Sequence, residues 1–143
     1  MITVSQILAI LKNALENHFI AGKLTLDERH FILDFDTPTT TTNITNAINL
    51  LLMGHTLNKY KVPSLTKHLF VILREYRAVC YYRHVDLSAV VRFILFAVYD
   101  SGIIPLHDTE KTTIQQLIYD SLYLLNANAK IIPKRISLFG CLG

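Results

Sequence analysis

The chain has 143 residues, of which 51% are hydrophobic and 17% charged, and this length matches a single domain. The formal net charge of +3 is spread from Lys12 to Arg135, unlike the clustered basic patch of a nucleic-acid-binding domain, while Cys80 and Cys141 lack the spacing of a zinc site or disulfide framework. A high apolar fraction with few charges indicates either that much of the surface is apolar or that a partner covers part of it, and this favours an interaction protein.

The N-terminal segment is expected to be an amphipathic helix. Apolar residues recur at helical spacing from Val4 to Phe19, and Thr3 with Gln6 forms a capping box. The helix is expected to end near Gly22. The segment therefore has the pattern of a core-facing helix rather than a signal peptide.

The segment 24–36 fits two structures. Thr25 and Glu28 suit a second capping box, whereas alternating Phe31, Leu33 and Phe35 would suit a strand of a hairpin. We favour a short helix.

A proline followed by four threonines predicts a loop at 36–43, because β-branched polar residues favour extended backbone. A helix is expected next, over 45–58. Gly54 falls within its apolar stripe, where a missing side chain would let two helices approach closely or would cap the end of this helix.

The second half of the sequence has clear helix boundaries. Pro63 starts one helix, Asp86 is an N-cap for a helix over 87–101, and Asp108 caps a long final helix. The helix over 87–101 is apolar almost all round, as expected of a helix surrounded by others. We expect an all-α fold: a single domain over 1–143, built as a bundle of five to seven helices around this central one, with a tail at 127–143 that could fray.

No pattern of residues indicates an enzyme, a metal site or a cofactor. The six histidines lack the spacing of a zinc hydrolase, and Ser101, His107 and Asp108 are explained by a helix end and the next helix cap. The most apolar segment carries Arg92 and Asp100, so we expect no membrane span.

Two motifs, together with the order of the helices, resemble the apoptosis regulators of the B-cell-lymphoma-two family, particularly its short viral members. Leu50, Gly54 and His55 resemble the family's third homology motif, although His55 replaces the usual acid. The stretch 86–96 resembles the first homology motif, in which Ala89 stands where the family has an arginine that pairs with the incoming helix.

Arg92 lies one turn further along nearly the same face as Ala89 and could take over this pairing. The alternative is that Arg92 pairs with an acid of its own chain.

The resemblance implies a Bcl-like fold and an anti-apoptotic binding protein that sequesters amphipathic helices of pro-apoptotic proteins in a hydrophobic surface groove. It also implies a location in the host cytoplasm, with any association with mitochondria made through partners. The apolar composition is compatible with a homodimer. The expected groove residues are Leu57, Tyr60, Phe70, Leu73, Tyr76, Ala89, Arg92 and Phe96.

The alternative function is a viral structural or nucleic-acid-associated helical oligomer. Tyrosines and arginines interleave between Arg74 and Arg83, a combination that can stack bases and hold phosphates. Packed tyrosines with solvated arginines would produce the same pattern.

Overall fold

The computed structural model describes residues 2–17, 21–36, 38–51, 61–78, 84–103 and 108–138, with side chains up to residue 125 in the last helix. These residues form helices and connecting turns, with no strand among them, which confirms the expected all-α class. The elements in chain order are α1 (Val4–Leu15), α3 (Leu26–Leu33), the 3-10 helix η1 (Asp34–Asp36), α4 (Pro38–Leu51), α5 (Val62–Ala78), α6 (Leu87–Asp100) and α7 (Asp108–Leu138).

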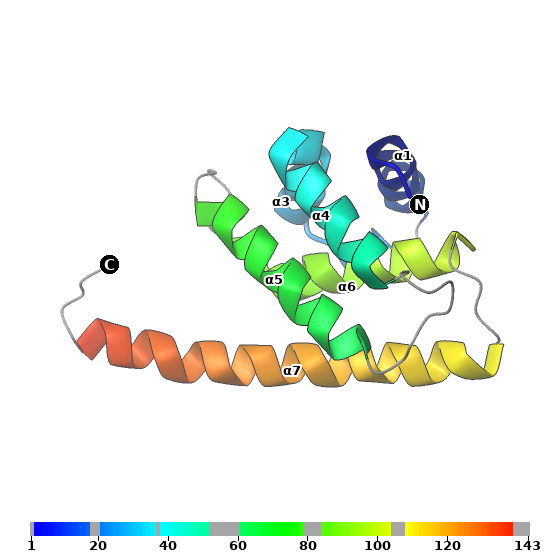
Figure 1. Cartoon of the computed structure of the whole chain (residues 1–143). Helices are drawn as coiled ribbons and strands as arrows, with labels where there is room; N and C mark the ends of the chain where they lie inside the picture. The colour runs from blue at the N-terminus through cyan, green and yellow to red at the C-terminus, as the bar shows by residue number, and fades with distance from the viewer. Residues whose placement is uncertain are drawn as a thin grey trace.

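Helix α6 lies at the centre of the bundle. Eleven of its fourteen residues are buried, and it packs against α1, α5 and α7. Figure 1 shows α7 running along one edge of the molecule, with the other labelled helices all lying on the same side of α7. The nearly all-round apolar sequence of α6 is thus matched by neighbours around most of its circumference.

The predicted helix starts are confirmed at three capping residues. The Thr3 and Thr25 side chains each accept a hydrogen bond from the backbone N–H three residues on, and Gln6 and Glu28 complete the two capping boxes. Asp86 caps α6, with its carboxylate accepting from the Ser88 N–H at 3.0 Å. The segment 24–36 is therefore helical rather than a hairpin.

At the other end of α6, the chain turns at Gly102, whose φ of +78° lies in the left-handed region. A glycine adopts this conformation without the steric cost that a side chain would add. The predicted stop of the central helix is confirmed.

The expected loop at 36–43 is wrong, because α4 begins at Pro38 and includes all four threonines. Proline suits the first turn of a helix, where its missing N–H is not needed. Two buried threonine hydroxyls of α4 have partners within the fold: Thr41 donates to the Phe35 carbonyl, and Thr45 donates to the Thr41 carbonyl at 2.8 Å. Tertiary burial of these residues outweighs their weak helix propensity.

Two other expected boundaries differ. Helix α1 ends at Leu15 rather than near Gly22, with Glu16 as its C-cap. The backbone of α7 continues as a helix through Leu138, which includes most of the expected tail at 127–143. The helix expected over 45–58 is seen as α4 up to Leu51, and its later residues lie outside the described part.

An aromatic cluster joins α3 and η1 to α5. The rings of Phe31, Phe35 and Tyr76 lie 5.2–5.7 Å apart between centroids, and the Tyr76 hydroxyl donates to the Asp34 carbonyl at 2.8 Å. Such aromatic pairs stabilise beyond the area they bury. The cluster fixes α5 in the core.

Helices α1 and α4 are tied together at the start of the chain. The Ile2 N–H donates to Asn49 Oδ1 at 3.0 Å, and Asn49 Nδ2 donates back to the Ile2 carbonyl at 2.8 Å. The residues before α1 are therefore bound to a helix far along the sequence.

Candidate functional site

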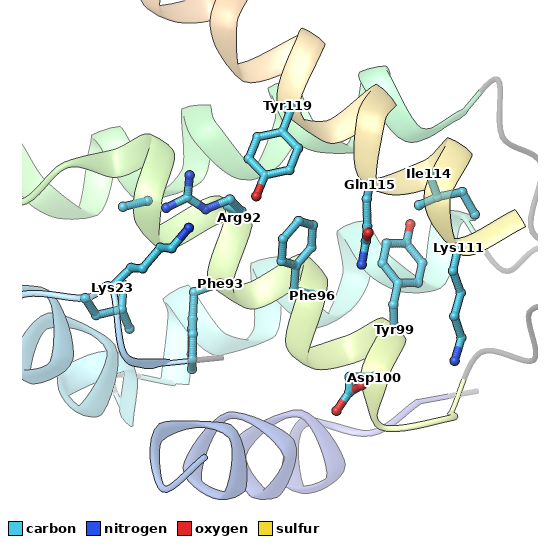
Figure 2. Close-up of a pocket in the computed structure, with 12 residues that line it drawn as sticks. Lys23, Arg92, Phe93, Phe96, Tyr99, Asp100, Lys111, Ile114, Gln115 and Tyr119 are labelled. Atoms are coloured by element: carbon cyan, nitrogen blue, oxygen red, sulfur yellow. The ribbon is translucent and has the colours of Figure 1, made fainter. Parts of the chain in front are cut away.

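A pocket of about 260 Å³ lies between α6 and α7 and extends to the turn before α3 (Figure 2). Each helix turns one face toward it, because the lining positions recur every three or four residues. Helix α6 contributes Ala89, Arg92, Phe93, Phe96, Tyr99 and Asp100. The other lining residues are Lys111, Ile114, Gln115 and Tyr119 of α7, with Lys23 and Leu24 of the turn.

A second, more open depression continues the pocket along the same two helices. Ala89, Arg92 and Tyr119 belong to both hollows, and the depression adds Asp86, Ser88, Asp120, Leu122 and Tyr123. We call the pocket and the depression together the α6–α7 trough. From Ala89 to Asp100 the trough follows α6 for about 16 Å, or roughly three turns.

Arg92 lies at the junction of the two hollows. Its guanidinium carbon is 5.6 Å from the centroid of the Tyr119 ring, within the range of a cation–π interaction. Phe96 packs edge-to-face on the same ring, with centroids 5.7 Å apart. These contacts hold the arginine in place while leaving its N–H groups available.

Within the described ranges, no carboxylate lies within ion-pair distance of Arg92. The alternative that Arg92 pairs with an acid of its own chain therefore finds no support there. An arginine that lines a trough without a carboxylate partner is suited to bind one from outside, since its planar fork matches that group.

The two ends of the trough differ in charge. Three cationic side chains, Lys23, Arg92 and Lys111, line the pocket against the single carboxylate of Asp100. The depression instead carries the carboxylates of Asp86 and Asp120. A complementary ligand would place a negative group in the pocket and a positive group toward the depression.

The pocket wall between these charges is mostly apolar. Phe93 and Ile114 are buried and Phe96 is partly buried, so they form a nonpolar surface beneath the cations. Tyr99 adds a hydroxyl at the end near Gln115, as Figure 2 shows. Burial raises the pKa of the Tyr99 phenol well above its ordinary value, so the group remains a neutral donor.

The side chains and the volume of the pocket bear on what it could hold. Among the residues with described positions, no three His, Cys, Asp or Glu side chains converge on a point where a metal ion could sit. The pocket is slightly smaller than typical small-molecule sites, which begin at about 300 Å³. Its size suits one or two side chains of a docked segment, or a very small ligand.

The structure brings together three of the predicted groove residues. Ala89, Arg92 and Phe96 line the pocket, whereas Phe70 and Leu73 are buried in the core.

Tyr76 is also buried in the core, with its hydroxyl bonded inside. The apolar face of α5 thus packs inward, because α4, α6 and α7 cover it, and does not line the trough. Leu50 is exposed on α4. The remaining predicted residues, Gly54, His55, Leu57 and Tyr60, lie outside the described residues.

The predicted groove residues did not include the α7 side of the pocket or the turn before α3. Lys111, Gln115 and Tyr119 recur every four residues, so a common helix face could have been recognised. The sequence does not indicate that this face of α7 lies against α6, because that pairing depends on tertiary packing. Tyr99 could have been found by extending the face of Arg92 and Phe96 by one turn.

Comparison of the chain with protein-family models, curated proteins and solved structures finds no match in any of the three. Within the part of the chain that the structure describes, no helix is both long enough and apolar enough to cross a bilayer.

Proposed function

We propose that the protein is a helix-binding module that holds an amphipathic helix of a pro-apoptotic protein in the α6–α7 trough, and that it inhibits cell death by sequestration rather than by catalysis. The partner class comes from the sequence resemblance to viral apoptosis regulators with a Bcl-like fold. In this proposal the protein acts in the host cytoplasm and reaches mitochondria only through its partners.

The observation that carries the proposal is the position of Arg92. Its guanidinium rests on Tyr119 at the middle of a trough with an apolar wall, and no carboxylate within the described ranges neutralises it. Helix-in-groove recognition combines apolar side chains at i, i+3 or i+4 and i+7 with a charge pair that fixes the register. Seven residues of helix span about 10 Å, which the trough accommodates.

The charge distribution favours one chemistry for the bound helix. Its apolar face would lie against Phe93, Phe96 and Ile114, with an aspartate or glutamate facing Arg92. A lysine or arginine of the partner would lie toward Asp86 and Asp120. A uniformly basic helix would be repelled from the pocket by its three cations.

Calorimetry with a panel of pro-apoptotic helix peptides tests this function. Arg92→Ala should weaken the binding of a peptide that carries the aspartate at least tenfold, since removing one partner of a largely desolvated charge pair costs roughly 2–5 kcal/mol. The matched control is Arg74→Ala, which removes an exposed arginine of α5.

A peptide whose aspartate is changed to alanine completes the cycle. Arg92→Ala should have little further effect on it, because the partner charge is already gone. Equal losses for both peptides would show that Arg92 does not pair with that aspartate. If no peptide bound and labelled RNA bound in a steeply salt-dependent manner, the nucleic-acid function would replace the one proposed.

The described members of the Tyr/Arg segment give that second function no specific support. Tyr76 is buried, and Arg77 donates to the Val85 carbonyl at 3.0 Å, so both are engaged inside the fold. We therefore retain helix binding as the one proposed function.

A further inference from the structure

Tyr99 has an unsatisfied polar group at the pocket. The residue is 8% exposed, and its hydroxyl oxygen is buried without a hydrogen-bond partner among the described residues. A buried hydroxyl left without a partner is costly, and native proteins seldom leave one unless a ligand or water completes the site.

The surroundings of Tyr99 identify where a partner could come from. Figure 2 shows the ring standing between α6 and α7, with the hydroxyl directed toward α7 on the side of Gln115. Gln115 is exposed and lines the same pocket. A small molecule at this end of the pocket would meet the Gln115 amide directly, and it would reach the Tyr99 hydroxyl, which is closed to solvent, only after a side chain of the pocket wall moved aside.

The opposite end of the pocket is cationic. Arg92 and Lys23 have no carboxylate within ion-pair distance in the described part of the chain. Arg92 and Tyr99 lie two turns apart on α6, which corresponds to about 10 Å. One compact anion cannot reach both ends, whereas an elongated molecule with a polar group at each end can.

The volume limits the body of such a molecule. A dry cavity of 150 Å³ binds benzene in another protein, so the pocket of about 260 Å³ has room for one ring and a short chain. Phe93, Phe96 and Ile114 supply the nonpolar wall that a ring would contact.

We propose that the α6–α7 pocket binds a small arylalkanoic acid, with its carboxylate at Arg92 and Lys23 and a para hydroxyl or carbonyl oxygen accepting a hydrogen bond from Tyr99. This binding does not depend on capture of a helix, because the full chain alone contains every group it uses. In the proposed trough the acid would compete with a docked helix for the pocket.

The test is calorimetric titration of the full chain with three probes: 3-(4-hydroxyphenyl)propionate, 3-phenylpropionate and the amide of the first. We expect saturable binding that is strongest for 3-(4-hydroxyphenyl)propionate, which carries both the hydroxyl and the carboxylate. The other two probes should bind more weakly, because each lacks one of these groups. Loss of the probe's hydroxyl should weaken binding about three- to tenfold, the usual effect of one hydrogen bond. Loss of the negative charge should weaken it at least as much.

Tyr99→Phe locates the hydrogen bond. In this variant the two acids should bind equally, so the preference for the hydroxylated probe disappears while binding through the carboxylate persists. Arg92→Gln should instead reduce the preference for the acid over its amide, with Lys23 supplying what remains of it. Thr113→Val, which removes an exposed hydroxyl of α7 outside the trough, is the control and should retain both preferences.

One outcome tests ligand binding itself, and another tests the role of Tyr99. Absence of saturable binding of the hydroxylated acid to the folded wild-type chain overturns the proposal, whatever the peptides do. A preference for the hydroxyl that survives in Tyr99→Phe overturns the role of Tyr99. The comparison of probes on wild-type protein remains decisive even if a variant does not fold.

Discussion

Glu28 joins two helix starts through one buried carboxylate. Its Oε1 accepts from the Thr25 N–H at 3.1 Å, and its Oε2 accepts from the Asp86 N–H at 3.3 Å. Thr25 precedes α3 and Asp86 precedes α6, so a residue that the sequence assigns only to a local capping box also fixes the position of the central helix.

Glu28→Ala should lower the free energy of unfolding by about 1–3 kcal/mol, because it leaves two backbone donors without their acceptor. Glu28→Gln should cost less, since its amide oxygen can still accept from one of them. Urea denaturation measures both. Asp27→Ala, which removes an exposed acid from the same turn, is the control; an equal loss in that variant would mean that helix charge, not the bridge, is responsible.

Tyr99 makes stability depend on alkaline pH. Burial raises the pKa of its phenol in the folded protein, whereas the unfolded chain ionises near pH 10. The folded state therefore keeps a proton that the unfolded state loses, and the stabilisation present below pH 10 declines as the pH rises above it, by about 1.4 kcal/mol per pH unit.

Tyr99→Phe should remove this dependence and shift alkaline unfolding to higher pH, as followed by circular dichroism. At neutral pH the variant should be at least as stable as the wild type, since the unsatisfied hydroxyl is gone. Tyr123→Phe should unfold at the wild-type pH. If the alkaline unfolding curves of the wild type, Tyr99→Phe and Tyr123→Phe coincided, the Tyr99 phenol would not be responsible for the loss of stability. Its burial would then not raise its pKa in the folded protein.

At the scale of elements, α4 shows how tertiary contacts can override local preference. Its threonine-rich start has the composition of a loop, yet Thr40, Thr41 and Thr45 are buried. The Thr41 hydroxyl bonds the Phe35 carbonyl, which belongs to η1, so it connects two elements. The Thr66 hydroxyl donates within its own helix, to the Val62 carbonyl at 2.8 Å.

These two buried threonines form a matched pair for mutation. Thr41→Val should lower the free energy of unfolding by about 1–3 kcal/mol, because it removes a donor between elements. Thr66→Val should cost less than about 1 kcal/mol, because the Val62 carbonyl keeps the regular hydrogen bond of the helix. Chemical denaturation of both variants checks the difference, and equal costs would argue against a connecting role for Thr41.

At the scale of the whole molecule, side chains of α7 complete one side of the core. Ile114, Ile118 and Leu122 are buried, and Leu125 packs at the edge of the core. Helix α7 has 31 residues and so spans about 46 Å, longer than the other helices (Figure 1).

Deletion of residues 138–143 should leave the fold intact, with a melting temperature within a few degrees of the full chain. Leu122→Ala should by contrast lower the free energy of unfolding by about 2–5 kcal/mol, as expected for a buried leucine. Thermal unfolding followed at 222 nm compares the two. A truncated chain that did not fold would assign Leu138 or Phe139 to the core.

The sequence predicted those features of the fold that depend on nearby residues. Capping boxes at Thr3 and Thr25 and the cap at Asp86 are local patterns, and they set helix starts correctly. The apolar face of α5 was equally readable, but whether it would line a groove or fill the core depends on which helices cover it. Arg92 could be singled out from its spacing, whereas its contact with Tyr119 required the pairing of α6 with α7.

The double hydrogen bond between Ile2 and Asn49 gives an experimental handle on slow motion. The Ile2 amide precedes the first helix, where backbone protons ordinarily exchange with solvent almost at once, yet its proton is held by the side chain of α4. Its exchange in heavy water therefore requires α1 and α4 to part. Compared with protons in the middle of α6, the Ile2 amide would report whether the bundle opens at this seam before it unfolds as a unit.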